Sequence, residues 1–268
     1  MFRLVKSEGG AEYLISDTIP CRHGFSTRNG GVSSLPHTSS LNLAFGRGDD
    51  DETVMKNLRI FAGAVGFDAE KTVSVPQVHS ADVRIIRKED AGLGYTRNAP
   101  EGFDGYVTAD SDIPIGVKTA DCVPILFASV RAGEVVSVGA VHAGWRGTVS
   151  GIASECVKKL IGLDARSDEI RVAVGPCIHP CCYEVGQDFF DKVCEIRGDT
   201  FAHEFISCRD GKLFADLTGM NVRILTDAGI PRENIDVCTL CTCCHPEMFY
   251  SHRYTGGKRG TMCSVIVK

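Results

Sequence analysis

The chain has 268 residues, 43% of them hydrophobic, which is long enough to bury a large core. Its net charge of −5 and its pI near 5.9 argue against a nucleic acid or an anionic membrane surface as partner. No apolar run approaches the roughly 18 residues of a membrane helix. The first residues lack a signal-peptide core, and 13 cysteines are too few for a disulfide scaffold. We therefore expect a cytoplasmic protein with reduced thiols.

The first half of the chain predicts one amphipathic helix followed by strands. The helix spans about residues 52–65, with Asp51 as its cap and Gly66 as its stop. The predicted strands cover residues 72–75, 83–87, 113–119, 123–128 and 135–141, with a turn at residues 133–134 before the last one. In the last three of these strands, apolar residues occur on both alternating sets of positions and not only on one, which indicates that both of their faces are buried.

The second half alternates helices with strands. A helix begins at Ile152, and another is capped by Asp216 and stopped by Gly229 in a left-handed conformation. Because the two kinds of element intermix without a break, we expect an α/β (α+β) layered fold in a single domain over residues 1–268. The predicted elements are helices at 152–163, 189–196 and 217–228 and strands at 170–174 and 262–267.

Three separated residues are the strongest candidates for a site. His79, Cys122 and His142 each follow an apolar, strand-like run, so a sheet would bring them to a common edge. Two imidazoles and a thiolate suit a zinc ion whose fourth position stays open. Asp121 adds a carboxylate for orientation or proton transfer. Taken singly, each residue also has an ordinary packing explanation, and the residue pattern alone leaves both interpretations open.

Two glycine-containing segments are candidates for binding an anion. Residues 144–147, Gly-Trp-Arg-Gly, form a turn that can present backbone N–H groups to a phosphate, with Arg146 beside them. Residues 29–31, Asn-Gly-Gly, lack the ending of a phosphate-binding loop and indicate a turn. Arg28, next to that turn, is a candidate to face a phosphate or ribose.

The densest group of cysteines lies at residues 238–244. It contains Cys-x-x-Cys spacing, which is found in structural zinc and iron–sulfur sites. A closed zinc site generally pairs two such segments, and no second one occurs outside this group. Cys177, Cys181 and Cys182 could join it only through tertiary proximity, so we expect reduced, packed thiols here.

Several motifs together resemble the YfiH/YlmD family, also called the polyphenol oxidase or laccase-domain family. The segments around His79, Cys122 and His142 are similar to the hallmark motifs of that family. Further resemblances follow in the same order along nearly the whole chain, at residues 25–33, 40–43, 104–108, 175–178, 241–242 and 249–253.

The resemblance implies that His79, Cys122 and His142 bind zinc. It also implies phosphorolysis of adenosine, guanosine, inosine and methylthioadenosine, together with deamination of adenosine. Purine nucleosides and phosphate are thus the expected partners of a monomeric enzyme. Arg28 and Asn42 match polar positions of the family pocket. The implied fold is a four-layer α/β/β/α sandwich of mixed sheets, shared with cytotoxic-necrotizing toxins.

The resemblance and the residue types together imply that Cys122, Asp121, Arg28 and Asn42 are catalytic, and that Arg28, Asn42 and Arg146 bind substrate. Two positions depart from the family pattern, because Thr261 and Tyr254 replace usual arginines. If those arginines bind phosphate or a partner, other cations must substitute for them. The available cations are Arg253, Lys258 and Arg259.

Three other functions compete with the nucleoside phosphorylase. A copper polyphenol oxidase would use a His₂Cys set, but a laccase needs several His-x-His pairs, and the eight histidines form none. A metal-free hydrolase would use Cys122 as nucleophile and His142 or His79 as base, on amide or peptidoglycan-type substrates. A non-enzymatic protein would need the metal only for folding.

Overall fold

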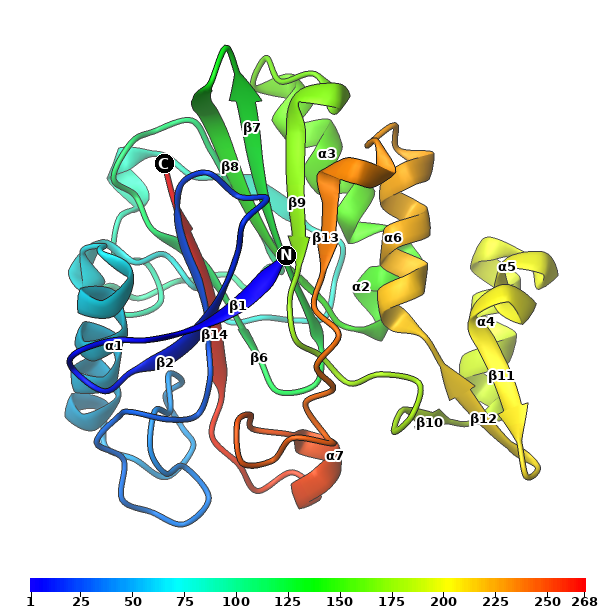
Figure 1. Ribbon diagram of the computed structural model, residues 1–268, viewed down its shortest axis with the longest axis horizontal. Coiled ribbons are helices and arrows are strands. Elements are labelled where there is room, and N and C mark those ends of the chain that lie inside the picture. Colours follow the sequence, from blue (N-terminus) through cyan, green and yellow to red (C-terminus); the bar gives the residue numbers. More distant parts are fainter.

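Two β-sheets form the centre of the computed structural model, which describes residues 1–268 (Figure 1). One sheet has five strands and is antiparallel throughout. In order across the sheet, its strands are β1 (Phe2–Lys6), β2 (Glu12–Ser16), β3 (Arg22–Ser26), β14 (Met262–Val267) and β6 (Ile115–Thr119). Within this sheet, β1, β2 and β3 are consecutive along the chain, and the C-terminal strand β14 lies between β3 and β6.

The other sheet has six strands and is mixed. Its two outer pairs are parallel and its inner pairs are antiparallel. The order is β13 (Ile235–Val237), β9 (Ile170–Val174), β7 (Val123–Arg131), β8 (Glu134–Ala143), β5 (Gly105–Thr108) and β4 (Val83–Ile85).

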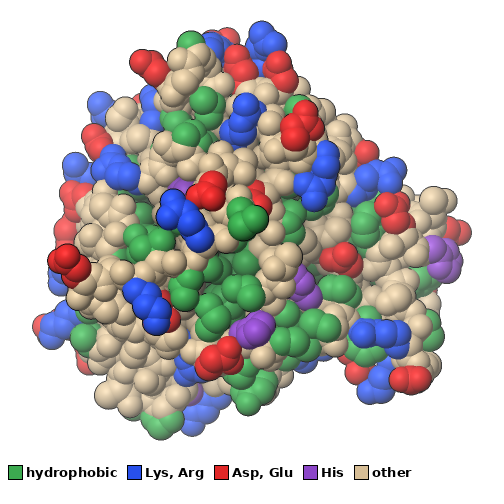
Figure 2. Space-filling model, viewed as in Figure 1, with side chains coloured by type: hydrophobic (Ala, Val, Ile, Leu, Met, Phe, Trp, Pro, Cys, Tyr) green, Lys and Arg blue, Asp and Glu red, His purple; other side chains and the backbone are tan.

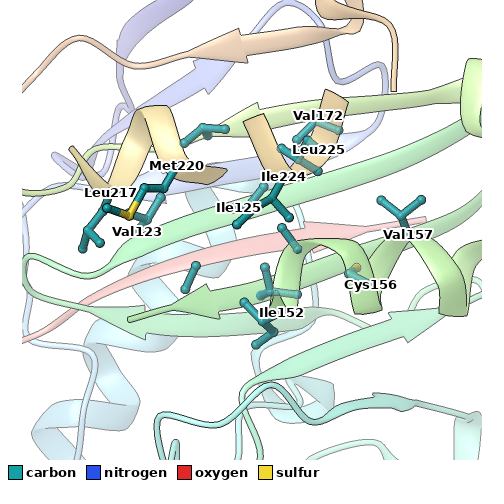
Figure 3. Packing of buried hydrophobic residues seen from close by; sticks show 14 of the residues in the cluster. Val123, Ile125, Ile152, Cys156, Val157, Val172, Leu217, Met220, Ile224 and Leu225 are labelled. Carbon is teal, nitrogen blue, oxygen red and sulfur yellow. The ribbon is translucent and has the colours of Figure 1, made fainter. Parts of the chain in front are cut away.

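Alternating side chains on the long central strands bind the layers together. On β7, Val123, Ile125 and Phe127 pack among the helices, whereas Leu126 and Ala128 pack against the five-stranded sheet. Figure 3 shows the helix side of this packing. Because both alternations are apolar and fully buried, β7 forms the middle of the molecule.

Helices cover the outer face of each sheet. The helix α1 (Asp51–Val65) covers the five-stranded sheet, and α3 (Ile152–Gly162) and α6 (Leu217–Asp227) cover the six-stranded one (Figure 1). This arrangement confirms the expected α/β/β/α layers. The remaining elements are α2 (Trp145–Ser150), α4 (Gln187–Arg197), α5 (Asp199–Phe205), α7 (His252–Thr255) and a small sheet of β10 (Glu184–Val185), β12 (Lys212–Ala215) and β11 (Ile206–Arg209).

Most predicted elements are present with small shifts of their ends. The cap of α1 is Asp50 rather than Asp51, and the cap of α6 is Asp216 as predicted. The strand predicted at residues 72–75 is wrong: Val73 makes only an isolated bridge to Ile115. The residues of this segment are buried, but only Val73 makes a backbone hydrogen bond to β6, through Gly116 N–H, and Ser74 N–H donates to the Leu93 carbonyl in a loop. The apolar run therefore does not become a strand.

The surface carries no concentration of positive charge on the face drawn in Figure 2. Lys and Arg side chains are interspersed there with Asp and Glu side chains. This mixture of both signs is consistent with the small net charge of −5. Among the helices, none combines the length and apolar character needed to cross a membrane.

Candidate metal centre and adjoining cavity

The structure brings His79, Cys122 and His142 together. Their ligand atoms all lie within 4.8 Å of one another, and the two imidazole rings are 4.9 Å apart in a T-shaped arrangement. Only His142 lies within a strand, near the end of β8; Cys122 joins β6 to β7, and His79 lies in a loop. The prediction that all three follow strands is therefore wrong, although the predicted grouping is correct.

Asp104, a buried carboxylate, organises two of these residues. It accepts hydrogen bonds from the backbone N–H groups of His79 (3.0 Å) and Ser80 (2.7 Å), which hold the loop around His79 in place. It also accepts a hydrogen bond from Nδ1 of His142 at 2.8 Å. Since Nδ1 is the donor to Asp104, Nε2 of His142 is the nitrogen that would bind a metal, after losing its proton.

Gly144 packs closely against the three candidate ligands. A Cβ atom placed there would lie 2.9 Å from Cδ2 of His79 and 3.4 Å from both Sγ of Cys122 and Cε1 of His142. Only a residue without a side chain therefore fits this position while the three ligands converge. His79 is exposed, Cys122 is half-buried and His142 is buried, so the group is open to solvent on one side. The donor set and this opening fit a divalent transition metal with a free coordination position.

The charges around Cys122 favour its thiolate form. Burial by itself raises the pKa of this thiol, but His142 and His79 outweigh burial and lower the pKa to about 6. Burial by itself lowers the pKa of His142, but the Cys122 thiolate and Asp104 raise it to about 9. A thiolate is the form of cysteine that binds metals, and it is also the form that acts as a nucleophile.

Asp121 is held rigidly beside Cys122. Its Oδ1 accepts a hydrogen bond from the Thr242 hydroxyl and its Oδ2 accepts one from the backbone N–H of Arg253, both at 2.7 Å. Its own backbone is left-handed, with φ of 99°. These contacts position the chain at Cys122, and Asp121 does not line the neighbouring cavity.

A cavity of about 420 Å³ opens onto the three candidate ligands. Three cationic side chains line it, and no carboxylate does: the cations are Arg47, Lys118 and Arg259. Nε of Arg259 is buried without a hydrogen-bond partner, and burial lowers the pKa of Lys118 to about 8. A cavity with this much unneutralised positive charge is suited to an anion.

The other residues predicted for the site lie outside the lining of this cavity. The guanidinium of Arg28 donates hydrogen bonds to the carbonyls of Ser39 and Pro246. Asn42 is fully buried and supports the cavity from behind, because its Oδ1 accepts a hydrogen bond from the backbone N–H of Thr261, which lines the wall. Arg146 is exposed, with its guanidinium 4.4 Å from the centre of the Trp145 ring.

Sequence reasoning missed several residues of the site. Gln77 lies in the motif around His79 but was not singled out, whereas Arg47 and Lys118 belong to no recognised motif, and their position becomes evident only when the loops fold together. Arg259 was one of three possible substitutes for a missing arginine; it alone of the three lines the cavity. Asp104 lies in a recognised motif at residues 104–108, and its position directly before a buried strand was the available signal.

A His–Cys–His group at the edge of a four-layer α/β/β/α frame, open to a cationic cavity, defines a candidate metalloprotein of the laccase-domain class. Residues 22–268 match the sequence model of the family described as multi-copper polyphenol oxidoreductase laccase. The chain belongs to this family, whose members include the YfiH and YlmD proteins.

Relatives of the chain carry two kinds of name. The purine nucleoside phosphorylase YlmD of Geobacillus stearothermophilus is 37% identical over 91% of this chain and 88% of its own length. The adenosine deaminase RL5 of an unknown prokaryotic organism is 35% identical over 88% of this chain and 90% of its own. The crystal structure of YlmD from G. stearothermophilus superposes with a TM-score of 0.86 at 32% identity, covering 99% of this chain and 98% of that one.

Proposed function

We propose that this protein is a zinc-dependent purine nucleoside phosphorylase that also deaminates adenosine. The proposal rests on one observation: the same cavity is lined by the His79–Cys122–His142 group and by three cationic side chains that have no acidic partner. Phosphorolysis needs an anion site, because phosphate must approach the ribose while the purine departs, and the three cations supply such a site. The names of the relatives, purine nucleoside phosphorylase and adenosine deaminase, support the same reaction classes.

His79, Cys122 and His142 would hold the zinc. When bound, zinc supplies Lewis acidity at its open coordination position. Asp104 keeps Nδ1 of His142 protonated, so that the other nitrogen faces the centre. Asp121 holds the backbone at Cys122 through its bonds to Thr242 and Arg253. In this proposal both aspartates are positioning residues.

The cations of the cavity would bind the phosphate. Arg259 offers an unpartnered buried Nε–H, and Lys118 is held by a hydrogen bond from Nζ to the Ser74 carbonyl at 3.0 Å. Arg47 extends from the loop that Asn42 stabilises, since Asn42 also bonds to Ala44 and Asp49 in the same loop. Arg28 and Asn42 were predicted to be catalytic and to bind substrate; in this proposal Asn42 supports the wall, and Arg28 holds the neighbouring loops through Ser39 and Pro246. Arg146 remains a predicted contact for substrate at the rim.

One competing function has a specific observation in its favour. The lowered pKa of Cys122 and the raised pKa of His142 are also what a metal-free cysteine hydrolase requires. Chelation separates the two, because a metal-free hydrolase keeps its activity in a chelator. The copper oxidase suggested by the family description needs additional histidine pairs, and the sequence has none.

The test is the release of free base from a panel of purine nucleosides, with and without phosphate. We expect base and ribose 1-phosphate only when phosphate is present, and loss of both products after chelation with recovery on adding zinc. Inosine formed from adenosine without phosphate would report the deaminase activity. Base release that ignores phosphate, or turnover that survives complete removal of metal, would contradict the proposal.

A further inference from the structure

Four cysteines outside the candidate centre meet in space from two distant loops. Cys181 and Cys182 follow β9, and Cys241 and Cys244 follow β13. These two strands are parallel neighbours, so both loops leave the same edge of the sheet. The two segments stay in contact beyond the ends of the strands, because Thr242 N–H donates a hydrogen bond to the Cys177 carbonyl at 2.9 Å.

The spacing of the four sulfurs matches a tetrahedral metal site. All four Sγ atoms lie within 4.8 Å of one another, and Sγ of Cys244 is 3.6 Å from that of Cys181 and 3.4 Å from that of Cys182. Zinc–sulfur bonds of about 2.3 Å place sulfurs about 3.8 Å apart in a tetrahedron. A disulfide would require about 2.05 Å, so the sulfurs are spaced for a shared ion and not for a covalent bond.

Local structure presents these sulfurs inward. Cys241 and Cys244 are spaced as a Cys-x-x-Cys turn, which the hydrogen bond from His245 N–H to the Cys241 carbonyl closes (3.2 Å). Sγ of Cys241 accepts a hydrogen bond from the backbone N–H of His179 at 3.4 Å. The facing turn is closed by Cys182 N–H donating to the His179 carbonyl at 2.9 Å. The two turns thus supply two thiols each.

Hydrophobic packing does not account for this group. Buried thiols such as Cys156, Cys238 and Cys263 fill the core, whereas Cys181 and Cys244 are exposed. An exposed thiol contributes little to a core, but it serves well at the surface-facing corner of a metal site. The proximity that the sequence could not reveal is therefore present, and it involves four cysteines from two loops.

We propose that Cys181, Cys182, Cys241 and Cys244 bind one structural zinc ion. Four thiolates in a tetrahedron select zinc or iron among common metals, and a site with four protein ligands has no open position for chemistry. This inference goes beyond the proposed function and does not depend on it.

The position of the four-cysteine group explains what such an ion would do. Thr242, between two of the cysteines, donates its hydroxyl hydrogen bond to Asp121, next to Cys122. Arg253 donates from its backbone to Asp121 and from its guanidinium to the Cys182 carbonyl at 3.1 Å. A zinc ion here would clamp both loops and so keep Asp121 in place.

The experiment measures zinc per chain in the full-length protein, produced with zinc and purified under reducing conditions without a chelator. We expect two zinc ions in the unaltered protein and one in Cys122→Ala. The double variant Cys181→Ser/Cys244→Ser should also retain one. Cys208→Ser, which removes an exposed thiol on β11 that is not one of the four, is the matched control and should retain two.

X-ray absorption at the zinc edge of Cys122→Ala identifies the ligands of the remaining ion. The expected signature is four sulfurs at about 2.3 Å and no imidazole. This readout uses a variant that leaves the four cysteines intact, so it stands even if the double serine variant does not fold. It also requires no turnover, so an inactive protein with this signature would still support the site.

Four results would overturn the proposal. They are a Cys122→Ala protein without zinc, zinc in that protein bound to nitrogen, iron in place of zinc, and fewer than 13 free thiols in the unfolded, metal-free wild type, which would indicate a disulfide.

Discussion

The centre formed by His79, Cys122 and His142 and the four-cysteine group differ in what surrounds them. The centre combines two nitrogens with one sulfur and opens into a cavity of about 420 Å³. The four-cysteine group has four sulfurs, and none of them lines that cavity. Cysteine content alone would rank the second group as the stronger metal site. The number of free coordination positions, and the space beside them, is what distinguishes chemistry from structural support.

Replacing Cys122 with Ala gives the largest expected effect on activity. Removing the sulfur ligand takes away the Lewis acid, and we expect nucleoside turnover to fall by about 10³-fold or more. Loss of this ion should lower the melting temperature less than loss of the ion from the four-cysteine group, because Asp104 already holds the loop around His79 through hydrogen bonds. Steady-state kinetics and calorimetry on the same preparation measure both quantities.

The matched variant for the other region is Cys181→Ser/Cys244→Ser. Here we expect the melting temperature to fall by roughly 5–10 °C, since a bound ion that stabilises only the folded state is lost. Turnover at low temperature should suffer far less than in Cys122→Ala. If both variants lose turnover and melting temperature to the same extent, the assignment of one region to chemistry and the other to structural support is wrong.

Lys118 and Arg259 test the cationic cavity. Replacing either with Met should raise the KM for phosphate by about tenfold to a hundredfold, because a charge-assisted hydrogen bond is lost. The KM for the nucleoside should change much less. Lys159→Met, at an exposed position on α3 outside the cavity lining, is the control variant. An equal rise of the phosphate KM in all three variants would show that these contacts are not specific to the cavity.

Asp104→Asn tests how the centre is organised. The amide keeps the size of the side chain but weakens the hold on Nδ1 of His142, so zinc affinity should fall by about 10–100-fold. Competition with a fluorescent chelator measures this affinity directly. The four-cysteine group should keep its ion in this variant, and loss of both ions would mean that Asp104 supports folding as a whole.

The pH dependence should report the ionisation of Lys118. Burial lowers its pKa to about 8, so its charge is present below that pH and is lost as the pH rises through it. The KM for phosphate should therefore rise above pH 8 towards the value of Lys118→Met. Lys118→Arg stays charged at those pH values and should remove this rise. A persistent rise in that variant would assign the effect to another group.

Gly144→Ala should give the smallest effect. Its backbone φ of −63° is open to any residue, so the fold should remain stable. The new methyl group meets the exposed His79 ring, which must swing outwards. We expect weaker zinc binding with an unchanged melting temperature, measured by metal competition and calorimetry. Unchanged zinc affinity would mean that the His79 ring has room to adjust.

Much of the fold follows from local sequence patterns. The strands β7 and β8 are apolar on both alternations, and that pattern arises wherever helices cover one face and a second sheet covers the other. The strand β1 was not predicted, because it lies at the edge of its sheet with three of its five residues exposed. An edge strand has weak alternation and leaves little trace in the sequence.

The sequence by itself determined the three candidate metal ligands, since each lies in a distinct motif and the motifs follow in order. Only the tertiary structure decided what surrounds them. Asp104 reaches His142 across 38 residues, and Cys181 meets Cys244 across 63. Such contacts depend on which strands become neighbours, as β9 and β13 do, and strand pairing between distant segments is set by the packing of the whole core. The cationic cavity and the four-cysteine group were therefore revealed by the fold and not by spacing along the chain.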